Sequence, residues 1–292
     1  TELPAVAAPP PATAEAREAS PAAKCRKWAF DVLLRLLNRH GNPRRAPDGA
    51  EAFAEAWSSK YSVRVTEIFL REACAQQQGS WVPKRSLSIA LLGLGAACTR
   101  DITYQAMRPG LQQLLAAGIF PHVRFGERDL RLWREDAEEF VRQLNDDFGA
   151  MQDPRTAAVE VVERLLRYHG DEVLLPLLQF CRGHLEAQAQ APADPELCAN
   201  KDGALLLLGS MGDDLLRLDP AQAERKKGKR RAAKKAAGGP SSVGTEEPLP
   251  RRAQPELSSP VAFMRLRASW AAPLGQRAGG QRLHRAAAPR GR

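Results

Sequence analysis

Apolar residues recur at helical spacing along most of the chain. The segment DPRTAAVEVVERLLRYHG (153–170) shows the pattern clearly, because one stripe repeats at i, i+3, i+4, i+7 and i+8. Asp153 is suited to the N-cap, and Pro154 to the first helical position, where its missing N–H has no partner to lose. Gly170 predicts a left-handed end to this helix. The stripe consists of Ala158, Val161, Val162, Leu165 and Leu166.

A second helix is predicted directly after Gly170. Asp171 opens it, and Pro176 should bend rather than break it, because the proline lies near the first turn. A single glycine between two helices predicts an antiparallel hairpin. The apolar stripe of this second helix consists of Leu174, Leu177, Leu178, Cys181 and Leu185.

The same organisation recurs along the chain, whereas signals of β-strands and β-hairpins are missing. Helix pairs follow one another at about the 40–47-residue spacing of HEAT repeats. A closed bundle would contain the same helices, but short connections without long crossovers favour a solenoid. The predicted fold class is therefore an all-α, HEAT-repeat α-solenoid. Further helices are expected at 25–40, 50–60, 62–78, 84–99, 104–119 (kinked at Pro109) and 136–148, with a short break between 60 and 62.

Composition divides the chain into five parts. Residues 1–23 are rich in Pro and Ala and have little apolar surface to offset chain entropy, so we expect disorder there. The helical-hairpin array is expected over 24–218, and 219–257 form a basic, flexible insertion. Residues 258–272 should begin a further HEAT helix, and 273–292 form a disordered tail rich in Arg and Gly.

Charge is distributed unevenly over these parts. Of the net charge of +9, residues 225–292 carry 17 basic and 3 acidic residues, which leaves 26 basic and 31 acidic residues before them. A nucleic-acid-binding domain usually carries its basic patch on the fold itself. The charge distribution therefore argues against nucleic acid as a partner of the helical array.

We find no constellation of residues that indicates an enzyme, a metal site or a cofactor. The sequence lacks GxxxxGK[ST], HExxH and GxSxG, and the Gly-bearing LLGLG stretch (91–95) lies inside a predicted helix, where close packing explains it. The five cysteines have no metal-ligand spacing, and their odd number argues against a disulfide framework. Cys98 and Cys181 fall in apolar patterns and are expected in the core. The longest apolar run is far too short to cross a bilayer.

Four stretches resemble one family when taken together. CRKWAFDVLLRLLNRHGNP (25–43), LWREDAEEFVR (132–142), NKDGALLLLGSM (200–211) and SSPVAFMRLRASW (258–270) are similar, in order and spacing, to landmarks of importin-β-like (karyopherin-β) nuclear import receptors. The branch concerned contains importins seven and eight and their plant counterparts. The matching positions, expected to be mostly structural, are Lys27, Trp28, Ala29, Leu132, Trp133, Glu135, Asp136, Lys201, Asp202, Gly203, Ala204, Arg265 and Trp270. At Ala137 the family usually has a proline, and after Trp270 the sequence departs from the family.

The resemblance implies a transport function based on binding. It implies a segment from the middle of a longer receptor, which shuttles between nucleus and cytoplasm, passes the nuclear pore on the Phe-Gly repeats of nucleoporins and carries cargo proteins, especially basic ones. It further implies regulation by the GTP form of the Ran GTPase, whose main binding site lies outside this segment. A HEAT-repeat scaffold without a transport role remains the alternative.

The run RKKGKRRAAKK (225–235) has eight basic residues in eleven positions and three open interpretations. The first is a solvated insertion without a dedicated role, and the second is a nuclear-localisation-like or nucleic-acid-contacting patch. The third is a cargo mimic that binds transiently to the acidic part of the protein and weakens the binding of basic cargo. The possible electrostatic contacts are Lys226, Lys227, Lys229, Arg230 and Arg231.

Overall fold

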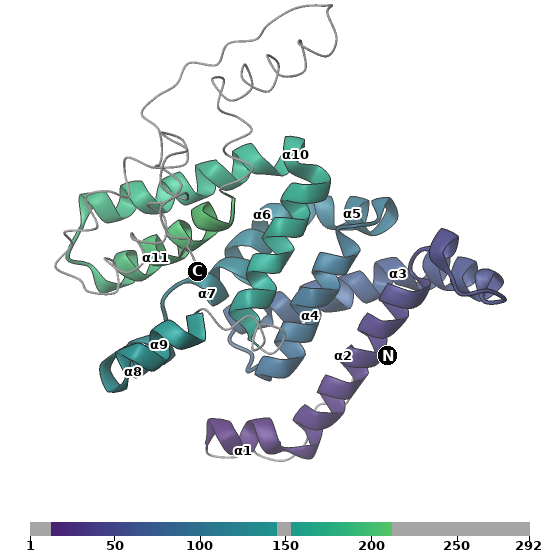
Figure 1. The fold of residues 1–292 in the computed structure, drawn as a ribbon, viewed down its shortest axis with the longest axis horizontal. Helices are drawn as coiled ribbons and strands as arrows, with labels where there is room; N and C mark the ends of the chain where they lie inside the picture. Colours follow the sequence, from purple (N-terminus) through teal and green to yellow (C-terminus); the bar gives the residue numbers. More distant parts are fainter. Residues whose placement is uncertain (1–12, 145–152, 212–292) are drawn as a thin grey trace, which may run out of the picture. The chain divides into compact units, whose positions relative to one another are not determined.

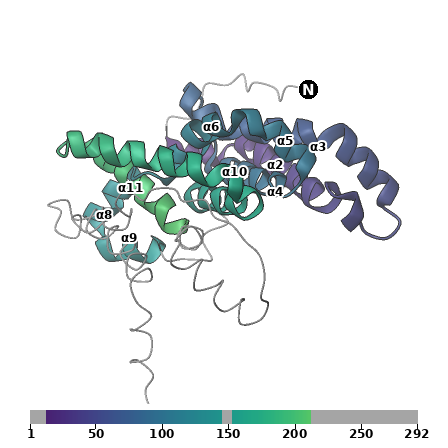
Figure 2. The ribbon, with the colours of Figure 1, turned by 90° about the horizontal axis from the view of Figure 1, so that it is seen from above.

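The computed structural model describes residues 13–144 and 153–211, and every regular element within these ranges is a helix (Figures 1 and 2). The predicted all-α, HEAT-type fold class is confirmed. The chain divides between Val173 and Leu174 into two compact units, which are described separately below. The predictions for 219–257, 258–272 and 273–292 lie outside the described residues.

The start of the array differs from the prediction. Disorder was expected over 1–23, but α1 (Ala14–Ala19) and the first turn of α2 (Pro21–His40) occupy residues 14–23. The hydroxyl oxygens of Thr13 and Ser20 accept hydrogen bonds from the third backbone N–H group after each of them, 3.2 Å away in both cases. Pro21 occupies the first position of α2. Local capping therefore compensates for the shortage of large apolar side chains, which composition alone did not reveal.

α1 is also held by a contact that is distant in sequence. The helix α4 (Lys84–Ala97) begins after Pro83, a residue that has no side-chain acceptor to cap it. The carboxylate of Glu18 takes that role, since its Oε1 accepts the backbone N–H of Lys84 at 2.7 Å. The guanidinium of Arg17 lies over the ring of Trp81, 5.5 Å from its centroid.

The helices α2, α3 (Glu51–Cys74) and α4 pack pairwise and form the core of the first unit (Figure 1). The rings of Phe30 and Phe69 meet between α2 and α3 with centroids 5.8 Å apart. The predicted break between residues 60 and 62 was wrong. No Gly or Pro interrupts 51–74, and the hydroxyls of Ser62 and Thr66 donate to carbonyls four residues earlier, so these polar side chains find acceptors inside the helix.

The LLGLG stretch lies inside α4, as predicted, and its glycines permit close packing. A Cβ atom at Gly93 would lie 2.5 Å from Cδ2 of the fully buried Phe69, and one at Gly95 would lie 3.1 Å from Cδ of Arg164. The absence of side chains at these two positions lets neighbouring helices approach α4 closely.

Side chains from other elements satisfy the last carbonyls of α4. Arg100 donates to the carbonyl of Ala96 (2.5 Å) and also to Leu37 O at the end of α2 (2.8 Å). Thr103 donates to Ala97 O at 2.6 Å. These bonds occupy groups that a helix terminus leaves unpaired, and Arg100 thereby ties two helix ends together.

The region predicted as one helix over 104–119, with a kink at Pro109, is divided more finely. It contains α5 (Asp101–Met107), a 3₁₀ turn at Arg108–Gly110, α6 (Leu111–Gln113), a π-helical stretch at Leu114–Ile119 and α7 (Phe120–Val123). Pro109 lies in the 3₁₀ turn. Inside the π-helical stretch, Gly118 lies against the end of α3, where an added Cβ would be 3.3 Å from Cys74 Sγ.

The helix boundary expected near Gly170 is confirmed one residue earlier, at His169, but the left-handed conformation predicted for Gly170 was wrong. Two helices meet there at a kink and are labelled together as α10 (Pro154–Gln190); the φ of −136° and ψ of 30° at His169 are not helical. The antiparallel hairpin expected for these two helices stays a prediction. His169 is fixed by its surroundings: its Nε2 lies 2.8 Å from Cys98 O, and its ring stacks on Tyr104 with centroids 3.3 Å apart. Pro176 lies inside α10 without ending it, as predicted.

The second unit contains the end of α10 and α11 (Pro195–Ser210), joined by a short turn. Asp194 caps α11, since its Oδ1 accepts the N–H groups of Glu196 (2.8 Å) and Leu197 (3.1 Å). Cys181, on α10, is fully buried, as is Cys98 in the first unit, which confirms the predicted core positions of both cysteines.

Candidate protein-interaction surfaces

The LWRED motif forms a corner between two short helices. The sequence analysis missed α8 (Glu127–Glu135) and predicted one helix over 136–148, whereas α9 spans Ala137–Leu144 and later residues lie outside the described ranges. Asp136 joins the helices in an extended conformation; its N–H donates to Leu132 O (2.7 Å) and its Oδ1 accepts from Glu139 N (2.8 Å).

The aromatic residues of this corner lock its two helices together. The ring of Trp133 meets that of Phe140 edge-on at 5.4 Å, and Phe125 meets Phe140 at 5.8 Å. Ala137 occupies the first position of α9, where the proline usual in the family would also fit. The corner therefore forms without that proline. Leu132, Trp133 and Asp136 have structural roles here, while Glu135 is exposed.

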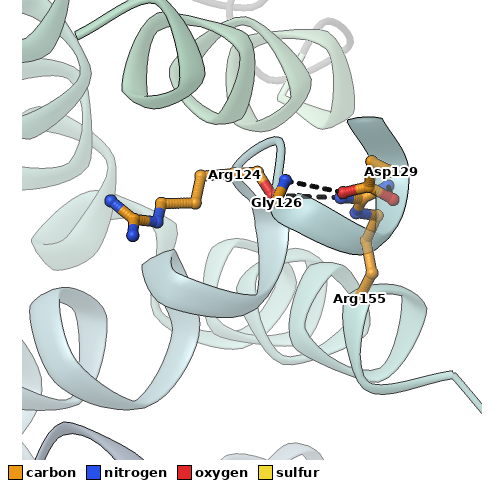
Figure 3. Close-up of polar contacts among 4 residues, drawn as sticks. All are labelled: Arg124, Gly126, Asp129 and Arg155. Atoms are coloured by element: carbon orange, nitrogen blue, oxygen red, sulfur yellow. Dashed lines mark hydrogen bonds and ion pairs between the residues drawn. The ribbon is translucent and has the colours of Figure 1, made fainter. Parts of the chain in front are cut away.

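An arginine fixes the start of α10 against the start of α8 (Figure 3). The carboxylate of Asp129 accepts the N–H of Gly126 (2.8 Å), which caps α8. Arg155 donates to both oxygens of that carboxylate and to Arg124 O, the latter at 3.0 Å. The side chains of Arg155 and Asp129 are only 15% and 19% exposed. This bidentate pair is a structural clamp rather than a binding site, because both terminal guanidinium nitrogens of Arg155 and both carboxylate oxygens of Asp129 are used within the fold.

The motif residues of α11 lie inside the second unit. Lys201, Asp202, Gly203 and Ala204 are all buried, and Asp202 is 1% exposed. The Lys201 ammonium donates to Oε1 of the buried Gln188 on α10 at 2.8 Å. These positions therefore hold α11 against α10 and are not accessible to a partner.

The α2 motif differs from the other two. Trp28 is 57% exposed, and the ammonium of Lys27 lies 4.2 Å from the centroid of its ring. Ala29 is half-buried. An exposed tryptophan in the middle of a helix contributes little to the packing of the described array, so Trp28 is available for contacts with a partner.

A groove of about 450 Å³ runs along α10 in the first unit and was missed by the sequence analysis. Burial, together with the neighbouring Glu160 carboxylate, raises the pKa of Glu163 against the opposite effect of Arg167. Arg164 pairs with Glu160 at 2.5 Å. The lining residues are Thr156, Val159, Glu160, Glu163, Arg164, Arg167 and Tyr168. These residues recur at helical spacing and form a mostly polar stripe beside the apolar stripe of the same helix. This pattern in the sequence could have indicated the groove.

Within 13–144 and 153–211, no three His, Cys, Asp or Glu side chains are grouped so that they could hold a metal ion. The same part of the chain contains no helix with the length and apolar character needed to span a bilayer. Burial raises the pKa of the Cys98 and Cys181 thiols to about 12, so both stay protonated near neutral pH and are poor nucleophiles.

Two motif positions and the predicted electrostatic contacts are not described by the structure. Arg265 and Trp270 lie outside the described residues, as do the basic positions Lys226, Lys227, Lys229, Arg230 and Arg231.

The fold and its surfaces define a HEAT-type helical-repeat protein. Comparison with known proteins then shows which family the chain resembles. The chain is 28% identical over 249 residues to the importin beta-like SAD2 homolog of Arabidopsis thaliana, covering 85% of this chain and 22% of that protein. It is 30% identical over 195 residues to human importin-8, covering 66% of this chain and 18% of that protein. It is 27% identical over 260 residues to the probable importin-7 homolog of Dictyostelium discoideum, covering 84% of this chain and 22% of that protein.

These similarities confirm the resemblance inferred from the sequence: the chain is similar to the importin-β-like receptors. It spans about a fifth of the length of the curated relatives it matches. No family profile matches the chain, and no solved structure matches it significantly.

Proposed function

We propose that the chain is part of a nuclear transport receptor, which binds protein cargo and shuttles between the cytoplasm and the nucleus through the nuclear pore. The observation that carries this proposal is the similarity to importin-8 and to the Arabidopsis importin beta-like protein over 66–85% of the chain. The receptor works by binding rather than catalysis. Its cargo is released by the GTP form of Ran, whose main site lies on a part of the receptor outside this chain.

Basic proteins are the cargo that the charge distribution favours. Residues 1–224 carry 31 acidic and 26 basic side chains, and Glu160 and Glu163 are among the residues that line the groove on α10. Because that groove also contains Arg164 and Arg167, it suits a cargo segment that carries both signs of charge. Many weak contacts of this kind, distributed over helical repeats, make binding sensitive to salt.

Retention on nucleoporin repeats tests the transport role. The 292-residue chain is passed over beads that carry Phe-Gly repeats, with Ser-Gly repeats of equal length as the control. A transport receptor is retained on the Phe-Gly beads alone. If the chain is retained on neither the Phe-Gly nor the Ser-Gly beads, the result favours the alternative, a HEAT-repeat scaffold that assembles proteins without a transport role.

Deletion of 225–235 distinguishes the interpretations of the basic run. If the run mimics cargo, the deletion strengthens the binding of a basic cargo peptide at low salt, whereas unchanged affinity rules this out. If the run contacts nucleic acid, the intact chain binds it with a steep salt dependence that the deletion abolishes. If neither binding changes, the run is a solvated insertion.

A further inference from the structure

The solvent-facing side of α2 has the composition of a binding surface. Its exposed residues recur at helical spacing, while Phe30 and Leu37 on the opposite side are buried. We define the outward face of α2 as Lys24, Trp28, Val32, Arg35 and Arg39, all of which are exposed.

Two large apolar side chains form the centre of this face. Trp28 and Val32 are one helical turn apart and are 57% and 53% exposed. Neighbours at this spacing lie side by side on a helix surface and form one continuous apolar patch. Lys27 lies over the Trp28 ring at 4.2 Å, and this cation–π contact restricts the ring before any partner arrives. A restricted aromatic ring loses less entropy on binding.

The charges around the patch are nearly all positive. Lys24, Lys27, Arg35 and Arg39 are cations within the same helical segment, whereas the single carboxylate there, Asp31, already pairs with Arg35 at 2.9 Å. The described residues therefore leave an excess of positive charge around an exposed apolar centre. A partner that matches it needs a large apolar side chain flanked by carboxylates.

We propose that the outward face of α2 is a docking site for an acidic amphipathic segment of a partner protein. An apolar side chain of that segment packs against Trp28 and Val32, and its carboxylates face Lys24 and Arg39. The Trp28 contact supplies most of the affinity, because tryptophans in the centre of an interface are common hot spots. The rim charges mainly set the association rate and the salt dependence. The site is independent of the proposed transport function.

Fluorescence anisotropy with a designed peptide tests this site. The probe is a labelled 15-residue helix-forming peptide with Leu and Phe at i, i+3, i+4 and i+7 and Glu at most other positions. We expect it to bind the 292-residue chain and to lose affinity steeply between about 0.05 and 0.5 M NaCl. Trp28→Ala should weaken binding about tenfold or more. The double variant Lys24→Gln/Arg39→Gln should weaken it less and flatten the salt dependence.

Two controls separate this site from other surfaces. Tyr61→Ala removes an equally exposed ring, 55% exposed, from α3 and should leave the affinity unchanged. A second peptide, with Gln in place of every Glu, should bind at least tenfold more weakly than the acidic one. Circular dichroism of each variant verifies that the helices are intact.

The proposal is overturned if Trp28→Ala and Tyr61→Ala have equal effects, or if the Gln peptide binds as tightly as the acidic one. It is also overturned if sedimentation equilibrium shows a dimer that Trp28→Ala dissociates, because a second copy would then occupy this face. None of these results depends on retention by Phe-Gly repeats, so failure here leaves the transport proposal standing.

Discussion

Asp129 serves two elements with a single carboxylate: it caps α8 and accepts the paired hydrogen bonds of Arg155. Removal of the guanidinium would leave that carboxylate charged and only 19% exposed. We expect Arg155→Ala to lower the free energy of unfolding by about 2 kcal/mol, measured by urea denaturation. Arg64→Ala is the matched control, because Arg64 pairs with Glu67 on the surface and should cost less than about 1 kcal/mol. Equal losses would contradict the clamp.

His122 should make stability depend on pH. Burial lowers its pKa below the ordinary value of 6.5, although the backbone of Ala73 and the carboxylate of Asp153 act in the opposite direction. Because the unfolded chain then binds the proton more tightly, the free energy of unfolding should fall as pH drops below about 6.5. The effect is at most about 1.4 kcal/mol per pH unit.

The measurement compares urea denaturation of the natural protein and His122→Gln between about pH 7.5 and pH 5.5. The variant should show a smaller loss of stability over this interval, and groups that titrate in both proteins cancel in the difference. Identical pH profiles would show that His122 is not the cause.

At the scale of elements, α4 depends on residues outside itself. Its N-terminus is capped by Glu18 of α1, so Glu18→Ala should cost about 1 kcal/mol and speed hydrogen exchange of the Lys84 amide. Glu15→Ala, in the same short helix, removes a carboxylate that does not cap α4 and is the control. An unchanged exchange rate at Lys84 in the Glu18 variant would contradict this cap.

Two glycines should respond to alanine with opposite signs. At Gly93 the added methyl would meet the ring of buried Phe69, so Gly93→Ala should destabilise the protein by about 1–3 kcal/mol. At Gly183, inside α10, nothing lies within 4 Å of the added carbon. Gly183→Ala should therefore stabilise by about 0.5–1 kcal/mol, through backbone entropy. Thermal unfolding measures both, and effects of the same sign would refute the close packing at Gly93.

At the scale of the whole molecule, the five cysteines report on the folded state. Cys25 is exposed, whereas Cys74, Cys98, Cys181 and Cys198 are buried. Pulsed alkylation under native conditions, followed by mass spectrometry, should label Cys25 rapidly and the other four only after unfolding. Rapid labelling of Cys74 and Cys98 together would contradict the fold of the first unit. The same result at Cys181 and Cys198 would contradict the fold of the second.

The sequence predicted element type better than element ends. Helical periodicity identified the helical content and the core positions of Cys98 and Cys181, because residues at this spacing form one continuous apolar face only when the segment is a helix. It wrongly divided α3, and it placed the break of α10 at a left-handed Gly170, whereas the non-helical residue is His169. These errors have one cause: whether a helix continues depends on contacts made elsewhere, such as those of His169 with Cys98 and Tyr104.

The sequence by itself determined an all-helical protein and its kinship with importin-β-like receptors, because apolar periodicity and the order of the motifs are properties of the chain alone. The tertiary structure decided what each motif residue does: Asp202 is buried, Asp136 forms a corner, and Trp28 faces solvent. The physical reason is that periodicity shows which residues share a face of a helix. Only packing between elements distant in the sequence decides which face meets the core and which is left for a partner.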